Sequence, residues 1–388
     1  MHRSRDEAFM RAAIALAQRG LGQTWPMPSV AALVVDESVD PAVMLGRGRT
    51  SPGGRPHAEA NAVAEAGAAA RGATMYVTLE PCARRSQRVF GPSCTEIILE
   101  SGIRRVVIGA ADPSPFASGE GATRLREAGI EVVTGVLEAE AQAVNLGHCL
   151  RVSQNRPLVT LKLAQTADGF AGTRDQKPLA ITGEEARAYV HRLRSTHDAL
   201  ITGIDTVLAD DPRLDVRLPG MAAMSPMRVV LDTTGRMPAG AAMLAQAGTK
   251  PVVIVSATDR NQFEKLLNPS VKDPIHSGHE MPEAIDIVIV PKGDDGHLDL
   301  AAVLGALAAR GITRVMVEAG PTLANAFARG GFVDRLALLT GGNASGDGLA
   351  AIGPDLAGWI ARAQLVEERA LGQDRLSVHV RACEEGAS

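Results

Sequence analysis

Short apolar runs alternate with helix-like stretches along most of the chain, and this alternation constrains the fold more than any other feature. The first series of apolar runs occupies residues 30–36, 42–48, 74–80, 104–111 and 131–136. The helical patterns around them occupy residues 6–20, 58–70, 93–101, 119–128 and 138–150. Strands that alternate with helices are typical of an α/β layer structure with a largely parallel sheet. We therefore expect such a fold at the N-terminal end of the chain.

The pattern restarts after the polar stretch RVSQNRP (151–157), which has the composition of a linker. The second series of apolar runs occupies residues 158–164, 198–203, 227–232, 251–256, 285–290 and 313–320. Helical patterns occur at 183–197 and near 299–310. A chain of 388 residues exceeds the usual size of one hydrophobic core. We therefore predict two α/β domains, at residues 1–152 and 157–385.

Composition narrows the class of partner. The net charge is −4 and the basic residues are spread along the chain, so we expect no nucleic-acid partner. No apolar run has the length of a signal peptide core or a membrane span, which predicts a cytoplasmic protein with no membrane partner. The four cysteines, Cys82, Cys94, Cys149 and Cys383, are expected to be thiols or metal ligands rather than disulfides. We expect Cys149 and Cys383 to be buried thiols.

His57 and Glu59 stand at the head of the alanine-rich helical run in RPHAEANAVAEAG (55–67). In the simpler interpretation, Glu59 favours the positive end of the helix dipole and His57 is a flanking polar residue. The alternative is a zinc site, which needs more ligands. The stretch VTLEPCARRSQRVFGPSC (77–94) offers Cys82 and Cys94, twelve residues apart.

These three residues match a catalytic rather than a structural zinc site, because catalytic zinc usually has three protein ligands and a water. Prolines near each cysteine favour helix starts, and a helix N-terminus lowers the pKa of a thiol. Glu59 need not bind the metal; it could carry protons from the zinc-bound water to a leaving amine. Positions i and i+2 diverge on a helix, so the substrate pocket should lie across the helix end. The combination of motifs is the zinc nucleobase-deaminase signature.

The chain resembles the bifunctional riboflavin-biosynthesis deaminase–reductase family over nearly its whole length. The resemblance rests on stretches such as PHAEANAVAEAG, GATMYVTLEPC, RVVIGAADPSP, RPLVTLKLAQTADG, HRLRSTHDALITGIDTVLADDPRLDVR and VEAGPTLANAF. It implies a cytidine-deaminase-like three-layer domain followed by a dihydrofolate-reductase-like domain. The implied reactions are hydrolytic removal of the 2-amino group from a diaminopyrimidinone ribosylamine phosphate, and NADPH-dependent reduction of the ribosyl side chain to ribityl.

The resemblance also implies roles for individual residues. In the deaminase domain, His57, Cys82 and Cys94 would bind zinc and Glu59 would be the proton shuttle. The implied NADPH contacts are Ala164, Thr206, Asp210, Thr233, Gly320, Pro321, Thr322, Leu323, Ala324, Asn325 and Ala326. The implied substrate contacts are Arg194, Leu214, Arg217 and Glu318. We also expect a homo-oligomer, either a dimer or a tetramer.

The residues of the second domain agree with these roles without requiring them. VMVEAGPTLANAF (315–327) is a strand, a glycine and a proline-started helix, so free backbone N–H groups could face a phosphate, although a generic strand–helix turn has the same pattern. Arg194 and Arg217 could clamp the substrate phosphate through forked hydrogen bonds, or be solvated surface residues. His191 and His197, both expected within the helix at 183–197, are predicted to be ordinary surface or packing residues.

Several positions depart from the family pattern. Met27 stands where an amide is usual, Thr50 or a neighbour replaces a histidine, and Pro178 and Ala180 replace a common serine and tryptophan. The spacing between Cys82 and Cys94 is also wider than usual. Two alternatives therefore stay open: a deaminase of another nucleobase, such as a tRNA adenine or free cytosine, and a zinc-stabilised regulatory protein without turnover. The acidic net charge and the reductase-like half argue against an RNA substrate, and retention of Glu59 argues against a purely structural zinc.

Overall fold

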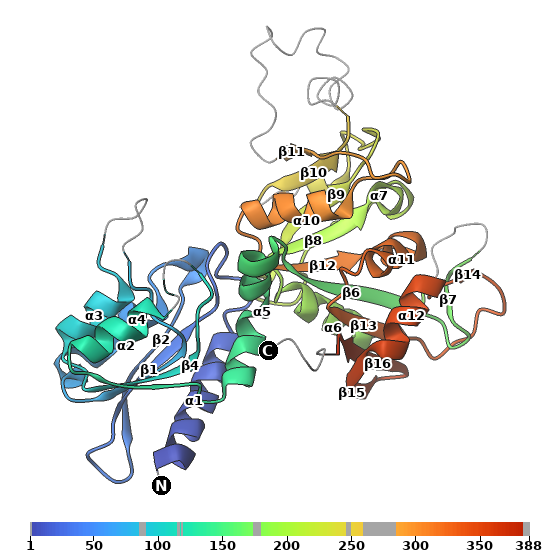
Figure 1. Ribbon diagram of the computed structural model, residues 1–388. Coiled ribbons are helices and arrows are strands. Elements are labelled where there is room, and N and C mark those ends of the chain that lie inside the picture. Colours follow the sequence, from blue (N-terminus) through green and yellow to red (C-terminus); the bar gives the residue numbers. More distant parts are fainter. Residues whose placement is uncertain are drawn as a thin grey trace, which may run out of the picture. The chain divides into compact units, whose positions relative to one another are not determined.

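The chain folds into two compact units, each with its own sheet (Figure 1). The structure is a computed structural model, and it describes residues 2–84, 91–114, 117, 119–173, 180–245, 250–258 and 285–382. The first unit comprises Met1–Arg156 with Arg310–Thr313, and the second comprises Pro157–Ala309 with Arg314–Ser388. Among the described residues, no helix has the length and apolar character needed to span a membrane.

The first unit is a five-stranded sheet between two layers of helices. Its strands are β1 (Ala31–Asp36), β2 (Val43–Arg49), β3 (Thr74–Leu79), β4 (Arg105–Ala110) and β5 (Glu131–Thr134), in the order β2-β1-β3-β4-β5. Its helices are α1 (His2–Gln18), α2 (Ala58–Ala66), α3 (Cys94–Ser101), α4 (Glu120–Glu127) and α5 (Glu138–Gln154), with short 3-10 turns at Pro52–Gly54 and Gly67–Ala70. Helices α2, α3 and α4 lie on one face, and α1 and α5 lie on the other (Figure 1). This is the three-layer arrangement predicted from the sequence.

The central strands of this sheet are apolar because both of their faces are covered. All six residues of β3 and all six of β4 are buried, as expected for strands between two helical layers. A buried ion pair ties α1 to the sheet, since the guanidinium of Arg105 on β4 donates two hydrogen bonds of 2.8 Å to the carboxylate of Asp6 on α1. Such a two-pronged pair fixes direction as well as distance.

The second unit contains a nine-stranded sheet in the order β11-β10-β9-β8-β12-β6-β13-β16-β15. Its strands are β6 (Leu158–Gln165), β8 (Ala199–Gly203), β9 (Met227–Leu231), β10 (Val252–Ser256), β11 (Ile285–Ile289), β12 (Arg314–Glu318), β13 (Arg335–Thr340), β15 (Gln364–Leu371) and β16 (Asp374–Val380), and a separate ladder joins β7 (Phe170–Gly172) to β14 (Leu349–Ala350). Its helices are α6 (Glu184–Arg194), α7 (Ile204–Asp210), α8 (Ala242–Ala245), α10 (Leu300–Ala309), α11 (Pro321–Arg329) and α12 (Pro354–Arg362), with a 3-10 turn at Ala222–Met224. The seven strands from β11 to β13 are parallel, and β16 and β15 continue the sheet in antiparallel fashion.

The structure corrects four predictions about local structure. The first sheet is only half parallel, because β1 pairs antiparallel with both β2 and β3. Residues 151–154 of the expected linker continue helix α5. His197 lies after the end of α6, so it is not a helix residue. Its side chain is fully buried. Cys149, on α5, is only partly buried, whereas we predicted a buried thiol. The prediction for Cys383, and that for Pro178, fall outside the described residues.

Candidate active sites

The start of α2 carries His57 and Glu59. His57 is the N-cap residue of α2 and Glu59 lies in its first turn. Two glycines of β2 allow α2 to lie directly on the sheet: a β-carbon at Gly48 would overlap the carbonyl oxygen of Ala58, and one at Gly46 would overlap that of Ala62. The close approach of helix and strand therefore fixes where the first turn of α2 begins.

The two cysteines reach the start of α2 from different elements. Cys94 is the first residue of α3, whose N-terminus has a capping box formed by Ser93 and Glu96. Cys82 lies in the segment that leaves β3, so the prediction that it too stands at a helix start is wrong. Its sulfur nevertheless meets a helix N-terminus, because the backbone N–H of Cys94 points to it at 3.4 Å.

His57, Cys82 and Cys94 converge with a geometry that suits zinc. Nδ1 of His57 lies 3.3 Å from Sγ of Cys94 and 3.9 Å from Sγ of Cys82, and all three ligand atoms lie within 4.8 Å of one another. Zinc–sulfur bonds of about 2.3 Å and zinc–nitrogen bonds of about 2.0 Å at tetrahedral angles separate N from S by about 3.6 Å. The observed separations bracket that value, so one imidazole nitrogen and two thiolates fit a zinc ion with a fourth position open.

Burial and hydrogen bonding set the charges around this cluster. A hydrogen bond with Cys94, together with contacts to its N–H and to His57, lowers the pKa of Cys82 to about 4 despite burial. The same hydrogen bond with Cys82, together with burial, raises the pKa of Cys94. Glu59 is 3% exposed, and burial raises the pKa of its carboxyl although His57 acts against this. A buried carboxyl with a raised pKa beside a metal-binding cluster is typical of a group that accepts and returns a proton.

Two of the positions that depart from the family pattern, Thr50 and Met27, lie in the same unit as this cluster. The hydroxyl of Thr50 is used by the main chain, since it accepts the N–H of Val30 at 3.1 Å. Met27 packs on Gly54, where a β-carbon would crowd the Met27 side chain. Thr50 therefore holds the start of β1, and Met27 offers an apolar thioether side chain next to the 52–54 turn.

The predicted cofactor residues of the second unit gather at one edge of its sheet. Ala164 lies near the end of β6, Thr206 follows β8 and Thr233 follows β9, and the predicted substrate residue Glu318 ends β12. These strands are parallel, so their carboxyl ends meet at the same edge, where α/β sheets usually bind their ligands. Asp210 lies farther along, as the exposed last residue of α7.

Only the first part of the segment Gly320–Ala326 is free for a cofactor. Gly320 is the N-cap of α11 and Pro321 is its first residue. Because glycine has no side chain, Gly320 does not cap the backbone N–H groups of the first turn. The segment lies against β8, because Leu323 is close to Gly203. Ala324 is fully buried, and the Asn325 amide is occupied with the N-terminus of α12, donating to Asp355 and accepting from two N–H groups. The first turn of α11 thus remains as the part of the segment that suits a phosphate.

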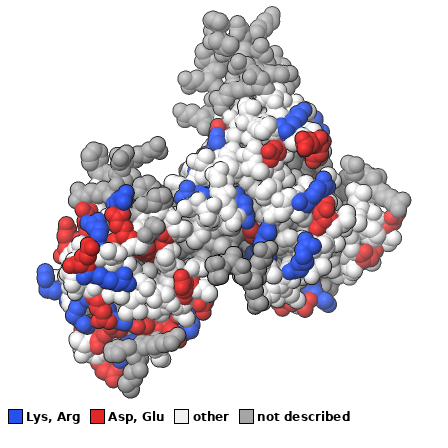
Figure 2. Space-filling model, viewed as in Figure 1, with Lys and Arg blue, Asp and Glu red and all other residues white. Residues whose placement is uncertain are grey.

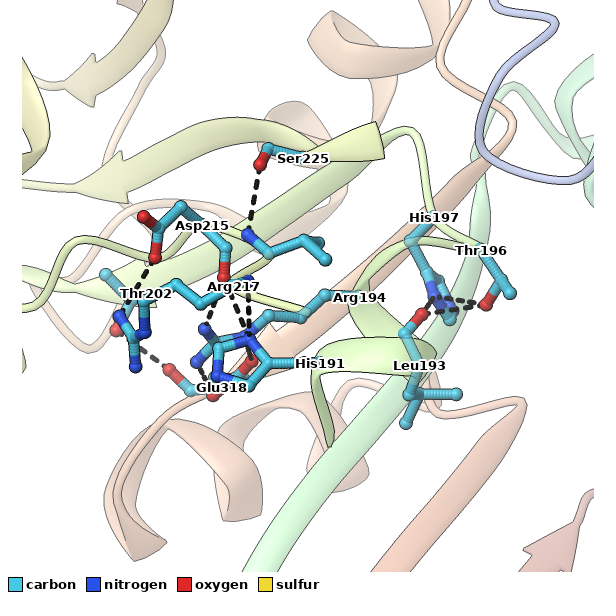
Figure 3. A network of polar contacts seen from close by, with 11 residues as sticks. His191, Leu193, Arg194, Thr196, His197, Thr202, Asp215, Arg217, Ser225 and Glu318 are labelled. Carbon is cyan, nitrogen blue, oxygen red and sulfur yellow. Dashed lines mark hydrogen bonds and ion pairs between the residues drawn. The ribbon is translucent and has the colours of Figure 1, made fainter. Parts of the chain in front are cut away.

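Three of the four predicted substrate residues, Arg194, Arg217 and Glu318, belong to one polar network (Figure 3). Arg194, at the end of α6, donates from Nε and Nη2 to the carboxylate of Glu318 at 2.6 and 2.9 Å, and from Nη1 to the Asp215 carbonyl at 2.8 Å. The Asp215 carboxylate accepts Nη1 of Arg217 at 2.9 Å. Arg217 is half exposed whereas Arg194 is 11% exposed. Arg217 therefore has more freedom to meet a phosphate, and the charge of Arg194 is already shared with Glu318.

The fourth predicted substrate residue, Leu214, is strained. Its φ is +51° and its side chain is buried, and nearby Asp211 has φ of +40°. Non-glycine residues in this region cost about 1–3 kcal/mol and concentrate at functional sites. The strain in this segment supports the prediction that its main chain is shaped for a ligand.

Sequence reasoning missed several residues of these sites. Lys162 on β6 pairs in register with Glu318, and burial lowers its pKa although Glu318 acts in the opposite direction. Asp215 joins Arg194 to Arg217 as described above. The sequence offered a signal for Lys162, because a charged residue inside the apolar run LVTLKLA (158–164) must be buried with a partner.

Comparison with known proteins assigns both units to families. The zinc-binding region of cytidine and deoxycytidylate deaminases matches residues 3–110, and the RibD C-terminal domain matches residues 157–376. The riboflavin biosynthesis protein RibD of Aquifex aeolicus is 36% identical over 90% of both chains, and that of Escherichia coli is 34% identical over 85% of this chain and 86% of its own. The chain belongs to the RibD family of riboflavin biosynthesis proteins. Membership confirms the predicted family, the α/β fold class, and the pairing of a zinc-dependent deaminase with an NADPH-dependent reductase.

Solved structures agree with this assignment. RibD of Acinetobacter baumannii superposes with a TM-score of 0.82 at 32% identity, covering 98% of this chain and 100% of that one. A deaminase/reductase of Thermotoga maritima, described as acting on diaminohydroxyphosphoribosylaminopyrimidine and 5-amino-6-(5-phosphoribosylamino)uracil, gives 0.79 at 30% identity with the same coverage. The RibD fold therefore extends over both units of this chain.

Proposed function

We propose that residues 1–152 deaminate the diaminopyrimidinone ribosylamine phosphate and that residues 157–385 reduce the ribosyl side chain of the deaminated product. The observation that carries the proposal is the convergence of His57, Cys82 and Cys94 beside the buried Glu59, in a chain of the RibD family. The compact units divide between residues 156 and 157, which supports this allocation of the two reactions.

In the deaminase unit, His57 Nδ1 and the thiolates of Cys82 and Cys94 would hold the zinc. When bound, zinc supplies a water-derived nucleophile at neutral pH. Glu59 takes the proton of that nucleophile and returns it to the departing amine, and its burial keeps the proton from exchanging freely with solvent. Because His57 is the N-cap of α2 and Glu59 lies in its first turn, we place the pyrimidine across the N-terminal end of that helix.

In the reductase unit, NADPH supplies the hydride. Its binding is assigned to Ala164, Thr206, Asp210, Thr233 and the first turn of α11, with the later residues of the 320–326 segment supporting that turn. Arg217 and Arg194 bind the ribose phosphate, Glu318 holds Arg194 in place, and the strained main chain at Leu214 lines the same region. These residues position the sugar against the cofactor at the carboxyl ends of β6, β8 and β12.

The test is an assay of the purified chain with the pyrimidine ribosylamine phosphate, with and without NADPH. We expect ammonia release in both cases and NADPH oxidation only when the deaminated product is present. Ammonia release from another nucleobase but not from this substrate would favour a different deaminase. One zinc per chain with neither reaction would favour the regulatory alternative.

We also propose a homo-oligomer, and a surface through which it forms. Strand β15 ends the strand order, is exposed along most of its length, and presents Leu365 and Val366 half exposed. An exposed edge strand with half-exposed apolar side chains can pair antiparallel with the same strand of a second copy about a two-fold axis. Light scattering of Val366→Lys tests this: we expect a smaller assembly than wild type, and an unchanged mass would exclude this edge. A cytoplasmic location is proposed with it.

A further inference from the structure

The segment 80–84, which leaves β3 and carries Cys82, is held from two sides. On one side stands α3: the backbone N–H and the hydroxyl of Thr95 both donate to the Cys82 carbonyl, at 3.2 and 3.1 Å. Helix α4 stands on the other side and contains none of the proposed metal ligands. How α4 is attached therefore bears on where the Cys82 sulfur lies.

Glu80 makes the main attachment. It is the first residue after β3 and is 5% exposed. Its carboxylate accepts the backbone N–H groups of Gly119 and Ala122 at 2.9 and 3.1 Å, at the N-terminus of α4. Its own N–H donates to the carbonyl of Ala110 at 2.9 Å. A carboxylate is costly to bury unless it is hydrogen bonded, and here two N–H groups and the positive end of a helix compensate it.

Three further contacts join α4 to the same segment. Gly121 lies so close to Pro81 that a β-carbon there would overlap the Pro81 carbonyl oxygen. The guanidinium of Arg124 donates to the carbonyl of Ala83. On the surface, Arg84 and Glu120 form an ion pair of 2.8 Å. Residues on both sides of Cys82 are thus fixed to one helix, while its carbonyl is fixed to another.

We propose that Glu80 is a positioning residue for the deaminase centre: by holding α4 against residues 80–84, it sets the place of the Cys82 thiolate relative to His57 and Cys94. This inference rests on the proposed zinc site. According to this proposal, α4 contributes to metal retention although none of its side chains is a proposed metal ligand. Groups that orient metal ligands typically contribute about ten- to a hundredfold to metal affinity.

The experiment compares Glu80→Gln with the matched control Glu127→Gln, an exposed carboxylate that ends the same helix and is not among the contacts described above. A glutamine keeps the size of the side chain but can accept only through its single oxygen, and its amide N–H₂ would face an N–H group. We expect both variants to contain one zinc per chain at saturating metal. Release of zinc to a chromogenic chelator should be about ten- to a hundredfold faster in Glu80→Gln, and the visible absorption of the cobalt-substituted protein should change. Glu127→Gln should match wild type in both.

One zinc per chain at saturating metal reports that the first unit is folded in the variant, and reductase turnover on deaminated substrate reports the same for the second unit. Wild-type zinc release and cobalt spectrum in Glu80→Gln would overturn the proposal, even if the variant is less stable to heat. If Glu80→Gln does not fold, Gly121→Ala decides: pushing α4 away from Pro81 should likewise speed zinc release, and unchanged release would refute the inference. A wild-type chain that binds no zinc would instead refute the proposed metal site itself.

Discussion

Replacing Glu59 by glutamine separates the two interpretations of this residue, a proton carrier or a carboxylate that merely suits a helix start. Glu59 is 3% exposed, and burial raises its pKa, with His57 acting in the opposite direction. A residue whose only role was the helix dipole would do better at the surface, because a buried charge loses its hydration. Glutamine has the same shape but cannot carry a proton between water and amine.

The expected loss follows from this difference. Removing a general acid–base group costs about 10²- to 10⁴-fold in rate, equivalent to about 2.7–5.4 kcal/mol in the activation free energy. Zinc content should stay at one per chain, since all three ligands are unchanged. Thermal stability should be unchanged or slightly higher, because a carboxyl whose charged form is disfavoured by burial is replaced by a neutral amide.

The assay measures ammonia release from the pyrimidine ribosylamine phosphate, with NADPH oxidation on deaminated substrate as an internal control. Glu65→Gln is the matched variant, since Glu65 lies on the same helix and its exposed carboxylate accepts only the N–H of Arg47 at 2.9 Å in the described part of the chain. We expect nearly normal ammonia release from it. Ammonia release near the wild-type rate in Glu59→Gln, with zinc retained, would refute the reasoning and leave Glu59 as a helix-start residue.

Three other predictions concern binding, packing and pH. Arg194→Ala and Arg217→Ala should each raise the KM for the pyrimidine substrate about ten- to a hundredfold in the reductase assay, as expected for a lost charged hydrogen bond, and leave the KM for NADPH nearly unchanged; the reverse result would assign them to the cofactor. Gly48→Ala should displace the start of α2 and lower ammonia release about tenfold or more without affecting the reductase, and an unaffected deaminase would show that α2 can shift without harm. Burial lowers the pKa of His197 to about 3, so below its unfolded value near 6.5 the unfolded chain binds a proton that the folded chain does not. The free energy of unfolding of the second unit should therefore fall by about 2 kcal/mol between pH 7 and pH 5, as measured by denaturant titration, and His197→Gln should remove most of this dependence.

The ends of the strands in the first unit could be predicted to within one or two residues, because each strand is an apolar run between polar segments. Which strands pair, and in which direction, could not be predicted, because alternation of strands and helices does not specify pairing. Hence the antiparallel pairs of β1 were unexpected. The last strands of the second unit escaped prediction for another reason: β15 is exposed along most of its length and reads QLVEERAL, a sequence without the apolar run that marks a buried strand.

The site residues divide in the same way. His57, Glu59, Cys82 and Cys94 could be recognised because their spacing in the sequence is itself the signature of the chemistry. The groups that hold them in place could not, because each acts on a distant segment. Glu80 is an example, since its carboxylate accepts a hydrogen bond from the backbone N–H of Gly119, 39 residues farther along the chain. No local pattern connects such positions, so a folded structure was required to find them.

Both sites are built at the carboxyl ends of parallel strands, and this explains how the chain can depart from its family without losing its chemistry. Cys82 follows β3 and is held by contacts with α3 and α4, and Glu318 ends β12, where the hydrogen bonds of a buried strand fix its position. Met27 and Ala180 lie instead in loops, where a change of side chain does not move a strand. We expect substitutions in such loops to alter how a base or a nicotinamide fits, and to leave the proposed zinc ligands and the proposed proton carrier in place. Differences between this chain and other members of the RibD family should therefore appear in substrate and cofactor affinity before they appear in the chemical steps.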